Sequence, residues 1–501
     1  MVRLRHRHRR PGATADDDRH GAVPDRFAVK SAIAAVRLRW VIEPIRRLTL
    51  LAAAIGLTSP IVTLAQERVP AVQPEVSAAA FVAWARGHAI PLPACTSPSG
   101  MTGMEGIRVV VGNARVVALG EPAHGAHEPL AFRNCLFRYL VEQGGFTAIA
   151  VESGLSESRL LYDYAAGGPG DARQLARNGF TWGFGRFSEN VELLEWVRRY
   201  NADPGHRRKV GFYGIDLSGG EASGLWLNAR ITLQDSLGYL SRTEPRLSRR
   251  ARIAVAPFLD RFTQAGYAAL TPGERVRLRA AIDGLVDVFD RNRSGLIAAS
   301  TQTDYDWARR NAVVARQLEA LFHVSPPGPP GEDLSPEDYK ADAARDSAMA
   351  ENVRWVIERE GPAGRVLLFA HNGHIMNAPT RGGIWAVYAQ APVMMGQHLR
   401  QALGNDLLIM PISAGSNGPG LPPATQGSAS LDTRLAATGL EHFLLDIRPA
   451  RDEAPVGAWL AQTQSIRANF STENAISPAT ALDAVIFLDR LTPAVKFPTE
   501  P

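Results

Sequence analysis

The chain has 501 residues, of which 45% are hydrophobic and 21% are charged, so it has the composition of a folded globular protein. Its formal charge of +5 comes from the first 65 residues, which hold 12 Lys/Arg against 5 Asp/Glu and leave 43 basic and 45 acidic residues in the remainder. A main body this close to neutral argues against a nucleic-acid-binding protein.

The first 65 residues have the layout of a leader followed by a secretory signal. Residues 1–27 show no apolar periodicity and are predicted to be disordered, unless the gene start is over-extended. Arg46 and Arg47 then precede an apolar run over 48–57, and small residues follow at 63–65. This run is too short to span a membrane comfortably. We expect residues 1–65 to be removed on export to the periplasm or medium, leaving a catalytic domain over 66–501 without a stable membrane span. The alternative is that 48–57 is an ordinary buried helix.

The chain contains only two cysteines, Cys95 and Cys135. Two are too few for a disulfide-dense scaffold or a four-cysteine zinc site. In an oxidising compartment they could form a disulfide. They could equally be two free thiols, with Cys135 part of the core.

Strand and helix signals alternate in the first half of the main body. The helix-like patterns lie at 76–87, 129–144 and 188–200. The continuous apolar runs that predict strands lie at 115–119, 147–151 and 209–215. Such runs are typical of parallel strands that are covered on both faces. The alternation therefore predicts an α/β fold with a mainly parallel central sheet flanked by helices.

The alternation stops between residues 222 and 360, where helix signals predominate. Thr271 and Ser335 each precede a proline and stand three residues before an acid, a pattern typical of helix N-termini. We expect this segment to be a large helical insertion that packs over the sheet and forms one wall of the active-site cleft. Strand signals resume at 365–370, 407–412, 442–447 and 484–488, and the Gly/Ser/Pro-rich segment 413–430 is predicted to be a flexible surface loop.

Ionisable residues directly follow four of the predicted strands. Glu121 and His124 follow the first strand, within the stretch RVVALGEPAHGAHE at 115–128. The other three strands are followed by Glu152, Asp216 and His371. Ligands of open α/β sheets bind outside the carboxyl ends of the strands, so the four segments together indicate one site. Any one of these residues alone would more often be a helix cap or a turn former.

His124 is the candidate general base. A neutral imidazole can take a proton from water near pH 7 if a carboxylate orients it and stabilises the charge that it gains. Glu121 or Glu152 could be that partner. Arg133 lies on an otherwise apolar stripe of the following helix, where it would either be buried beside an anion or extend to water.

The sequence gives weaker support to metal-dependent or covalent catalysis. His371 and His374 form an H-x-x-H pair, and a zinc-like ligand set could be completed from Glu121, Glu152 and His124. However, the chain has no H-E-x-x-H motif, no G-x-S-x-G nucleophile elbow and no nucleotide-binding glycine motif. We therefore predict acid/base chemistry on a neutral small molecule, with no metal and no cofactor.

Taken together, the motifs resemble those of the erythromycin esterase family. The similar elements, in chain order from about 114 to beyond 399, are LGEPAHGAHE, Arg133, IAVE, FYGID, AHNGH and MGQHL. The resemblance implies hydrolysis of a macrolide lactone or related ester by water, without a covalent enzyme intermediate. The family's general base falls on His124, its two glutamates on Glu121 and Glu152, its helix arginine on Arg133 and its later histidine on His371. Our hypothesis is that Arg133 and His371 stabilise the developing oxyanion. His374 and Asp216 are predicted to orient the others.

Two segments depart from the family's pattern: Pro122 replaces a small residue, and 182–188 follows its aromatic pattern only loosely. Such loops shape substrate pockets, so these departures concern the choice of substrate rather than hydrolysis. Macrolides are the first substrates to try among esters and lactones. Two other hypotheses stay open: a metal-dependent hydrolase that uses the same His/Glu cluster, and a non-catalytic envelope protein that binds a glycan or polyketide. His127 and Glu128 are expected to serve helix entry, and no pattern specifies an oligomeric state.

Overall fold

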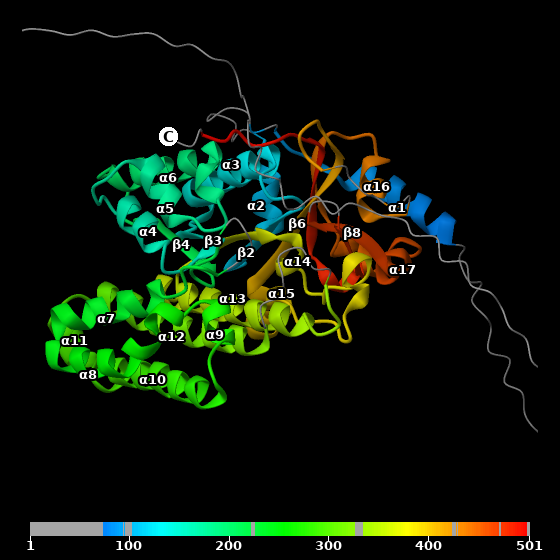
Figure 1. Ribbon diagram of the computed structural model, residues 1–501. Coiled ribbons are helices and arrows are strands. Elements are labelled where there is room, and N and C mark those ends of the chain that lie inside the picture. The colour runs from blue at the N-terminus through cyan, green and yellow to red at the C-terminus, as the bar shows by residue number, and fades with distance from the viewer. Residues whose placement is uncertain are drawn as a thin grey trace, which may run out of the picture. The chain divides into compact units, whose positions relative to one another are not determined.

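An eight-stranded sheet runs through the described part of the chain (Figure 1). The computed structural model describes residues 74–497 apart from 94, 96–102, 222–225, 326–333, 423–426, 428 and 470–471, and the predicted leader over 1–65 lies outside these residues. In spatial order the strands are β1 (Ile90–Pro91), β7 (His442–Asp446), β10 (Ala484–Leu491), β6 (Leu407–Asn417), β2 (Val116–Glu121), β5 (Val366–His371), β3 (Ala148–Gly154) and β4 (Gly211–Asp216).

The sheet is mainly parallel. β6, β2, β5, β3 and β4 pair in parallel, as do β10 and β6, whereas β7 runs antiparallel to both β10 and β1. The predicted mixed α/β fold is confirmed. β8 (Gln464–Asn469) and β9 (Thr472–Ile476) form a separate antiparallel pair that the sequence did not reveal.

Side chains of the central strands alternate between two hydrophobic cores. In β2, Val117 and Leu119 face one core, while Val116 and Ala118 face the other. The first core is covered by α2 (Glu105–Val111), α3 (His127–Gly144), α4 (Arg159–Ala165), α5 (Ala172–Gly179) and α6 (Ser188–Ala202). Burial on both faces explains why these strands have continuous apolar sequences.

The second core holds the remaining α-helices and, in particular, those between β4 and β5 (Figure 1). These last are α7 (Ile231–Thr243), α8 (Pro245–Val255), α9 (Gln264–Ala268), α10 (Pro272–Arg291), α11 (Arg293–Ala298), α12 (Gln302–Val324) and α13 (Tyr339–Glu360). The others are α1 (Pro74–His88), α14 (Asn372–Ile375), α15 (Met395–Leu403), α16 (Leu431–Ala436), α17 (Val456–Ala461) and α18 (Pro478–Ala481). Short 3-10 segments are η1 (Phe184–Arg186), η2 (Ala256–Arg261), η3 (Gly383–Val387), η4 (Gly404–Asp406) and η5 (Pro449–Asp452).

The two marked helix starts had different outcomes. Thr271 caps α10 in a capping box with Glu274, as predicted. The prediction of a helix start at Ser335 was wrong by several residues, because α13 begins only at Tyr339. The carboxylate of Asp338 accepts the Ser335 N–H at 2.8 Å, which closes a turn in front of the helix.

The predicted loop over 413–430 was also partly wrong. β6 continues to Asn417, because Ser413 and the residues after it pair with β10. A Cβ built at Gly415 would lie 2.5 Å from the carbonyl oxygen of Asp489, so the small residue permits close strand approach here. Strand pairing therefore overrides the loop-like composition.

Cys95 and Cys135 form a disulfide, with their Cα atoms 5.9 Å apart. This resolves the choice between a disulfide and two free thiols, and it ties the segment before α2 to α3. No helix in the described part of the chain combines the length and the hydrophobicity that crossing a bilayer requires.

Candidate active site

The four strand ends singled out in the sequence meet at one edge of the sheet. β2, β5, β3 and β4 are consecutive neighbours. Glu121, His371 and Asp216 are the last residues of β2, β5 and β4, and Glu152 lies two residues before the end of β3. Glu121 and His371 are directly opposite each other in the β2–β5 register. The parallel sheet thus brings together residues that are far apart in sequence.

His124 lies on the turn between β2 and α3 and is held by Glu121. Its Nδ1 is 2.5 Å from Glu121 Oε1, a contact in which the ring nitrogen donates to the carboxylate and Nε2 faces away from Glu121. Nε2 lies 3.9 Å from Glu152 Oε1, and the side chain is 17% exposed. Of the two candidate carboxylates, Glu121 is therefore the orienting partner, and the ring stays accessible to a reactant.

The ring of His371 lies against that of His124, with centroids 3.4 Å apart. The backbone N–H of His371 donates to Glu152 Oε2 at 2.8 Å. Burial and the neighbouring His124 hold the pKa of His371 well below its usual value, although Glu152 opposes this. His371 is consequently a neutral imidazole at pH 7.

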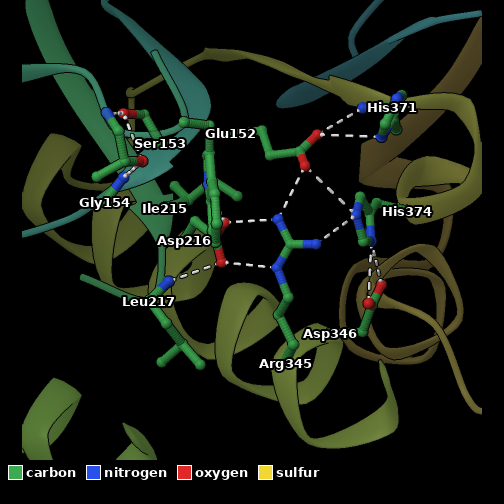
Figure 2. A network of polar contacts seen from close by, with 12 residues as sticks. Glu152, Ser153, Gly154, Ile215, Asp216, Leu217, Arg345, Asp346, His371 and His374 are labelled. Atoms are coloured by element: carbon green, nitrogen blue, oxygen red, sulfur yellow. Dashed lines mark hydrogen bonds and ion pairs between the residues drawn. The ribbon is translucent and has the colours of Figure 1, made fainter. Parts of the chain in front are cut away.

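Glu152 is surrounded by hydrogen-bond donors (Figure 2). Arg345 Nη2, from α13, donates to Glu152 Oε1 at 2.9 Å, and His374 Nε2 lies 3.4 Å from the same oxygen. Burial alone would raise the pKa of Glu152, but His374, His371 and His124 together hold it well below its ordinary value. The carboxylate is therefore ionised.

His374 and Asp346 form a second buried pair. His374 Nδ1 lies 2.9 Å from both carboxylate oxygens of Asp346, and the backbone N–H of Met395 also donates to Asp346 at 2.8 Å. Burial lowers the pKa of His374, but Asp346 and Glu152 outweigh it and raise this pKa to about 10. His374 is an imidazolium at neutral pH.

Asp216 anchors the other end of Arg345. It accepts Arg345 Nη2 at 2.6 Å and Nε at 3.1 Å, and Trp182 Nε1 donates to it at 2.9 Å. Arg345 thereby joins Asp216 and Glu152, as Figure 2 shows. We name Arg345, Asp346, His374 and Asp216 the clamp.

Arg133 is buried in α3 with its guanidinium 4.8 Å from the ring centre of Phe369. Within the described residues its hydrogen bonds go to the amide oxygen of Asn134, at 2.8 and 3.1 Å, rather than to a carboxylate. Burial lowers the pKa of Arg133 to about 10, although Glu121 and Glu189 oppose it, so the guanidinium stays charged.

A cavity of about 20 Å³ lies among these groups. Its polar lining includes Glu121, Arg133 and Glu152, and its apolar lining consists of Leu130, Val151, Phe180, Phe184, Phe187 and Phe369. This volume is enough for about one water molecule. A water in this cavity would lie beside the carboxylates of Glu121 and Glu152 and the guanidinium of Arg133.

The sequence reasoning missed Arg345 and Asp346. A signal was present, because Asp342, Arg345 and Asp346 occupy the same helical stripe as the buried Met349 and Val353 of α13. Charged residues on a sheet-facing stripe indicate a polar partner at that level of the sheet.

His127 and Glu128 lie at the start of α3. His127 pairs with Glu189 at 2.5 Å, and Glu128 accepts both the N–H and the hydroxyl of Thr492 at 2.6 Å. Both residues hold neighbouring segments to the helix N-terminus.

The comparisons with known proteins identify the family. The model of the erythromycin esterase family matches residues 141–491. The chain belongs to the erythromycin esterase family. The matched span begins after the turn that carries His124, and Glu121, His124 and Arg133 precede it.

Two erythromycin esterases of Escherichia coli are distant relatives in sequence. The chain is 24% identical to an erythromycin esterase type II of Escherichia coli, over 67% of this chain and 77% of that protein. It is 27% identical to an erythromycin esterase type I of Escherichia coli, over 58% of this chain and 68% of that protein.

Solved structures share the fold. A protein from Bacillus cereus superposes with a TM-score of 0.69 at 22% identity, covering 85% of this chain and 100% of that one. A succinoglycan biosynthesis protein gives 0.68 at 20% identity, covering 85% and 99%. An erythromycin esterase mutant in an open conformation gives 0.61 at 21% identity, covering 81% and 98%.

Proposed function

We propose that this chain hydrolyses a carboxylic ester or macrolactone with a water activated by His124, without a covalent enzyme intermediate. Family membership supports a hydrolase that acts on a small molecule. The single observation that carries the finer proposal is the pair formed by His124 and Glu121, with Nε2 3.9 Å from Glu152 Oε1. Both glutamates line the water-sized cavity.

In the proposed reaction, His124 acts as general base. A water placed between His124 Nε2 and Glu152, which are 3.9 Å apart, can hydrogen-bond to both. As its oxygen attacks the ester carbonyl carbon, Nε2 takes one proton and Glu121 stabilises the imidazolium. When the tetrahedral intermediate collapses, the carbon–oxygen bond to the alcohol breaks and His124 returns the proton to the leaving oxygen.

Arg133 and His371 are the proposed oxyanion stabilisers. Arg133 lines the cavity with a fixed positive charge in surroundings of low polarity, where such a charge stabilises a developing anion more than in water. His371 lies against His124 and, as a neutral ring, can donate one N–H without adding a second cation beside the base.

The test is a panel of macrolides and simple esters incubated with the purified mature protein. We expect a product heavier than a lactone substrate by one water, or an acid and an alcohol from a linear ester. Binding without any product would instead favour the non-catalytic envelope protein.

A metal-dependent hydrolase is the second candidate, because His124, Glu152 and His371 offer ligand atoms that all lie within 4.8 Å of one another. The charges nearby oppose a divalent cation, since Arg345 and the protonated His374 already neutralise Glu152. We expect activity to survive dialysis against a chelator. Loss of turnover that zinc or manganese restores would favour the metal-dependent reaction.

We also propose that the protein is exported. The disulfide between Cys95 and Cys135 supports this, because such bonds persist in oxidising compartments. N-terminal sequencing of protein from the periplasm or medium should find a start near residue 66, and a start upstream of 48 would contradict cleavage of the proposed signal.

A further inference from the structure

The C-terminal segment 492–497 runs between two parts of the active site. It leaves the end of β10 and passes the start of α3 and the start of α6, in red near the end marked C (Figure 1). We name residues 492–497 the C-terminal strap. Its isolated bridges join Ala126 to Pro493 and Phe187 to Lys496.

On one side, the strap is bonded to the turn that carries His124. The His127 N–H donates to the Thr492 carbonyl at 2.7 Å, and the Ala494 N–H donates to the Gly125 carbonyl at 2.8 Å. Both carboxylate oxygens of Glu128 accept hydrogen bonds from Thr492. These contacts hold the residues that directly follow His124 in the chain.

On the other side, the strap is bonded to the aromatic segment of the cavity wall. The Ser188 N–H donates to the Val495 carbonyl at 2.9 Å, and the Phe497 N–H donates to the Arg186 carbonyl at 2.9 Å. The guanidinium of Arg173 lies 4.4 Å from the ring centre of Phe497, which anchors the end of the strap on α5.

The segment that the strap holds carries the aromatic wall beside His124. The Phe184 ring centre is 4.7 Å from that of His124, and Phe184 and Phe187 are stacked 6.0 Å apart. A Cβ built at Gly125 would lie 2.8 Å from Phe187, and the φ of Gly125 is 70°, so the turn accommodates the ring only with glycine there. The wall and the turn therefore pack in a fixed relation that the strap bridges.

We infer that the C-terminal strap sets the distance between the aromatic wall and His124 and so selects esters by the size of their acyl group, a role that rests on the proposed hydrolase function. Since Phe180, Phe184, Phe187 and Phe369 leave room for little beyond a water, the acyl group must displace the wall in order to bind. A wall that the strap holds at residues 186–188 yields less to a long acyl chain than to a short one.

The test compares p-nitrophenyl esters from acetyl to hexanoyl in wild type, Phe497→Ala and Phe497→Tyr. We expect Phe497→Ala to raise the hexanoyl-to-acetyl ratio of kcat/KM about threefold or more, because pocket contacts of one or a few methylenes change discrimination by at least that much. Phe497→Tyr keeps the ring and should keep the wild-type ratio. A second variant, Arg173→Ala, removes the guanidinium that lies against Phe497. Its matched control is Arg293→Ala, which also removes an exposed guanidinium from an aromatic ring but does not touch the strap.

Hydrogen exchange provides a readout that does not need activity. In Phe497→Ala, deuterium uptake should rise in peptides covering 183–190 and stay unchanged in α12. Raised uptake without a changed acyl ratio, or no change in either, would overturn the inference. If wild type hydrolyses no ester on the panel, the proposed function fails, and exchange alone decides whether the strap holds the wall. If Phe497→Ala does not fold, Arg173→Ala makes the same comparison, with a smaller change expected in the same direction.

Discussion

The two sides of Glu152 differ in how their charges are held. On one side, His124 and Glu121 are three residues apart in sequence, and the His124 ring is partly exposed. On the other, the clamp pairs residues up to 129 positions apart, and Arg345 reaches Glu152 across 193 positions. The clamp lies largely buried, with each charge paired. A general base such as His124 must gain and lose a proton during the reaction. The clamp instead keeps fixed charges around the carboxylate of Glu152.

The largest expected effect on activity is that of His124→Asn. In the described part of the chain, His124 is the base candidate that is hydrogen-bonded to Glu121. We therefore expect kcat to fall about a thousandfold, with the fold unchanged. Steady-state kinetics and circular dichroism would measure both.

His127→Asn is the matched control, because His127 also pairs with a glutamate at 2.5 Å but faces Glu189. It should lose no more than about threefold of kcat, as expected for a partly exposed pair away from the reacting atoms. Equal losses in the two variants would contradict the assignment of His124.

Arg345→Met should chiefly damage the clamp. It leaves Glu152 and Asp216 as buried carboxylates without their shared cation, so the free energy of unfolding should fall by about 3 kcal/mol. Urea denaturation measures this. Arg291→Met, which breaks an exposed pair with Asp287, should cost at most about 0.5 kcal/mol. A similar small cost at Arg345 would show that the clamp contributes no stability.

Glu121→Gln separates orientation from base strength. The amide can still accept a hydrogen bond from Nδ1 but does not stabilise the imidazolium by charge, so we expect kcat to fall about tenfold to a hundredfold. The unfolding midpoint should change less than in Arg345→Met. An unchanged kcat would remove Glu121 from the mechanism.

The smallest expected effect is a pH dependence of stability. Although burial opposes the charged form, Asp346 and Glu152 raise the pKa of His374 to about 10 in the folded protein, from 6.5. The folded state then holds this proton more tightly, so the stabilisation is complete below about pH 6.5 and is lost as the pH rises toward 10. Asp346→Asn should reduce this loss in urea titrations across that range.

Asp452→Asn, at an exposed carboxylate, is the control for this titration. An equally steep loss of stability in Asp346→Asn and in wild type would contradict the pairing of Asp346 with a protonated His374. The depressed pKa of His371 acts in the opposite direction. As the pH falls below 6.5, the unfolded state binds a proton at this histidine that the folded state does not, so the free energy of unfolding falls.

The same contrast explains what the sequence could predict. The parallel strands, and the groups at their ends, were visible because apolar runs followed by Glu or His are local patterns. The pairing of His124 with Glu121 is local too. Arg345 was missed because its partners, Glu152 and Asp216, come from strands far earlier in the chain, and only packing of α13 against the sheet brings them together.

Other features also depended on packing. The choice between paired and free cysteines required the separation of Cys95 and Cys135 in space. β8 and β9 lie in a segment without a clear alternating pattern, and their antiparallel pairing defines them. The role of the C-terminal strap depends on backbone hydrogen bonds, which side-chain patterns do not encode.

One measurement tests the central claim most directly. Wild type and His124→Asn are incubated side by side with the ester and macrolide panel in ¹⁸O-labelled water, and the products are analysed by mass spectrometry. The account predicts that wild type forms an acid or ring-opened product carrying one labelled oxygen, and that His124→Asn forms almost none. Absence of product from wild type on every ester, or product from His124→Asn at the wild-type rate, would contradict it.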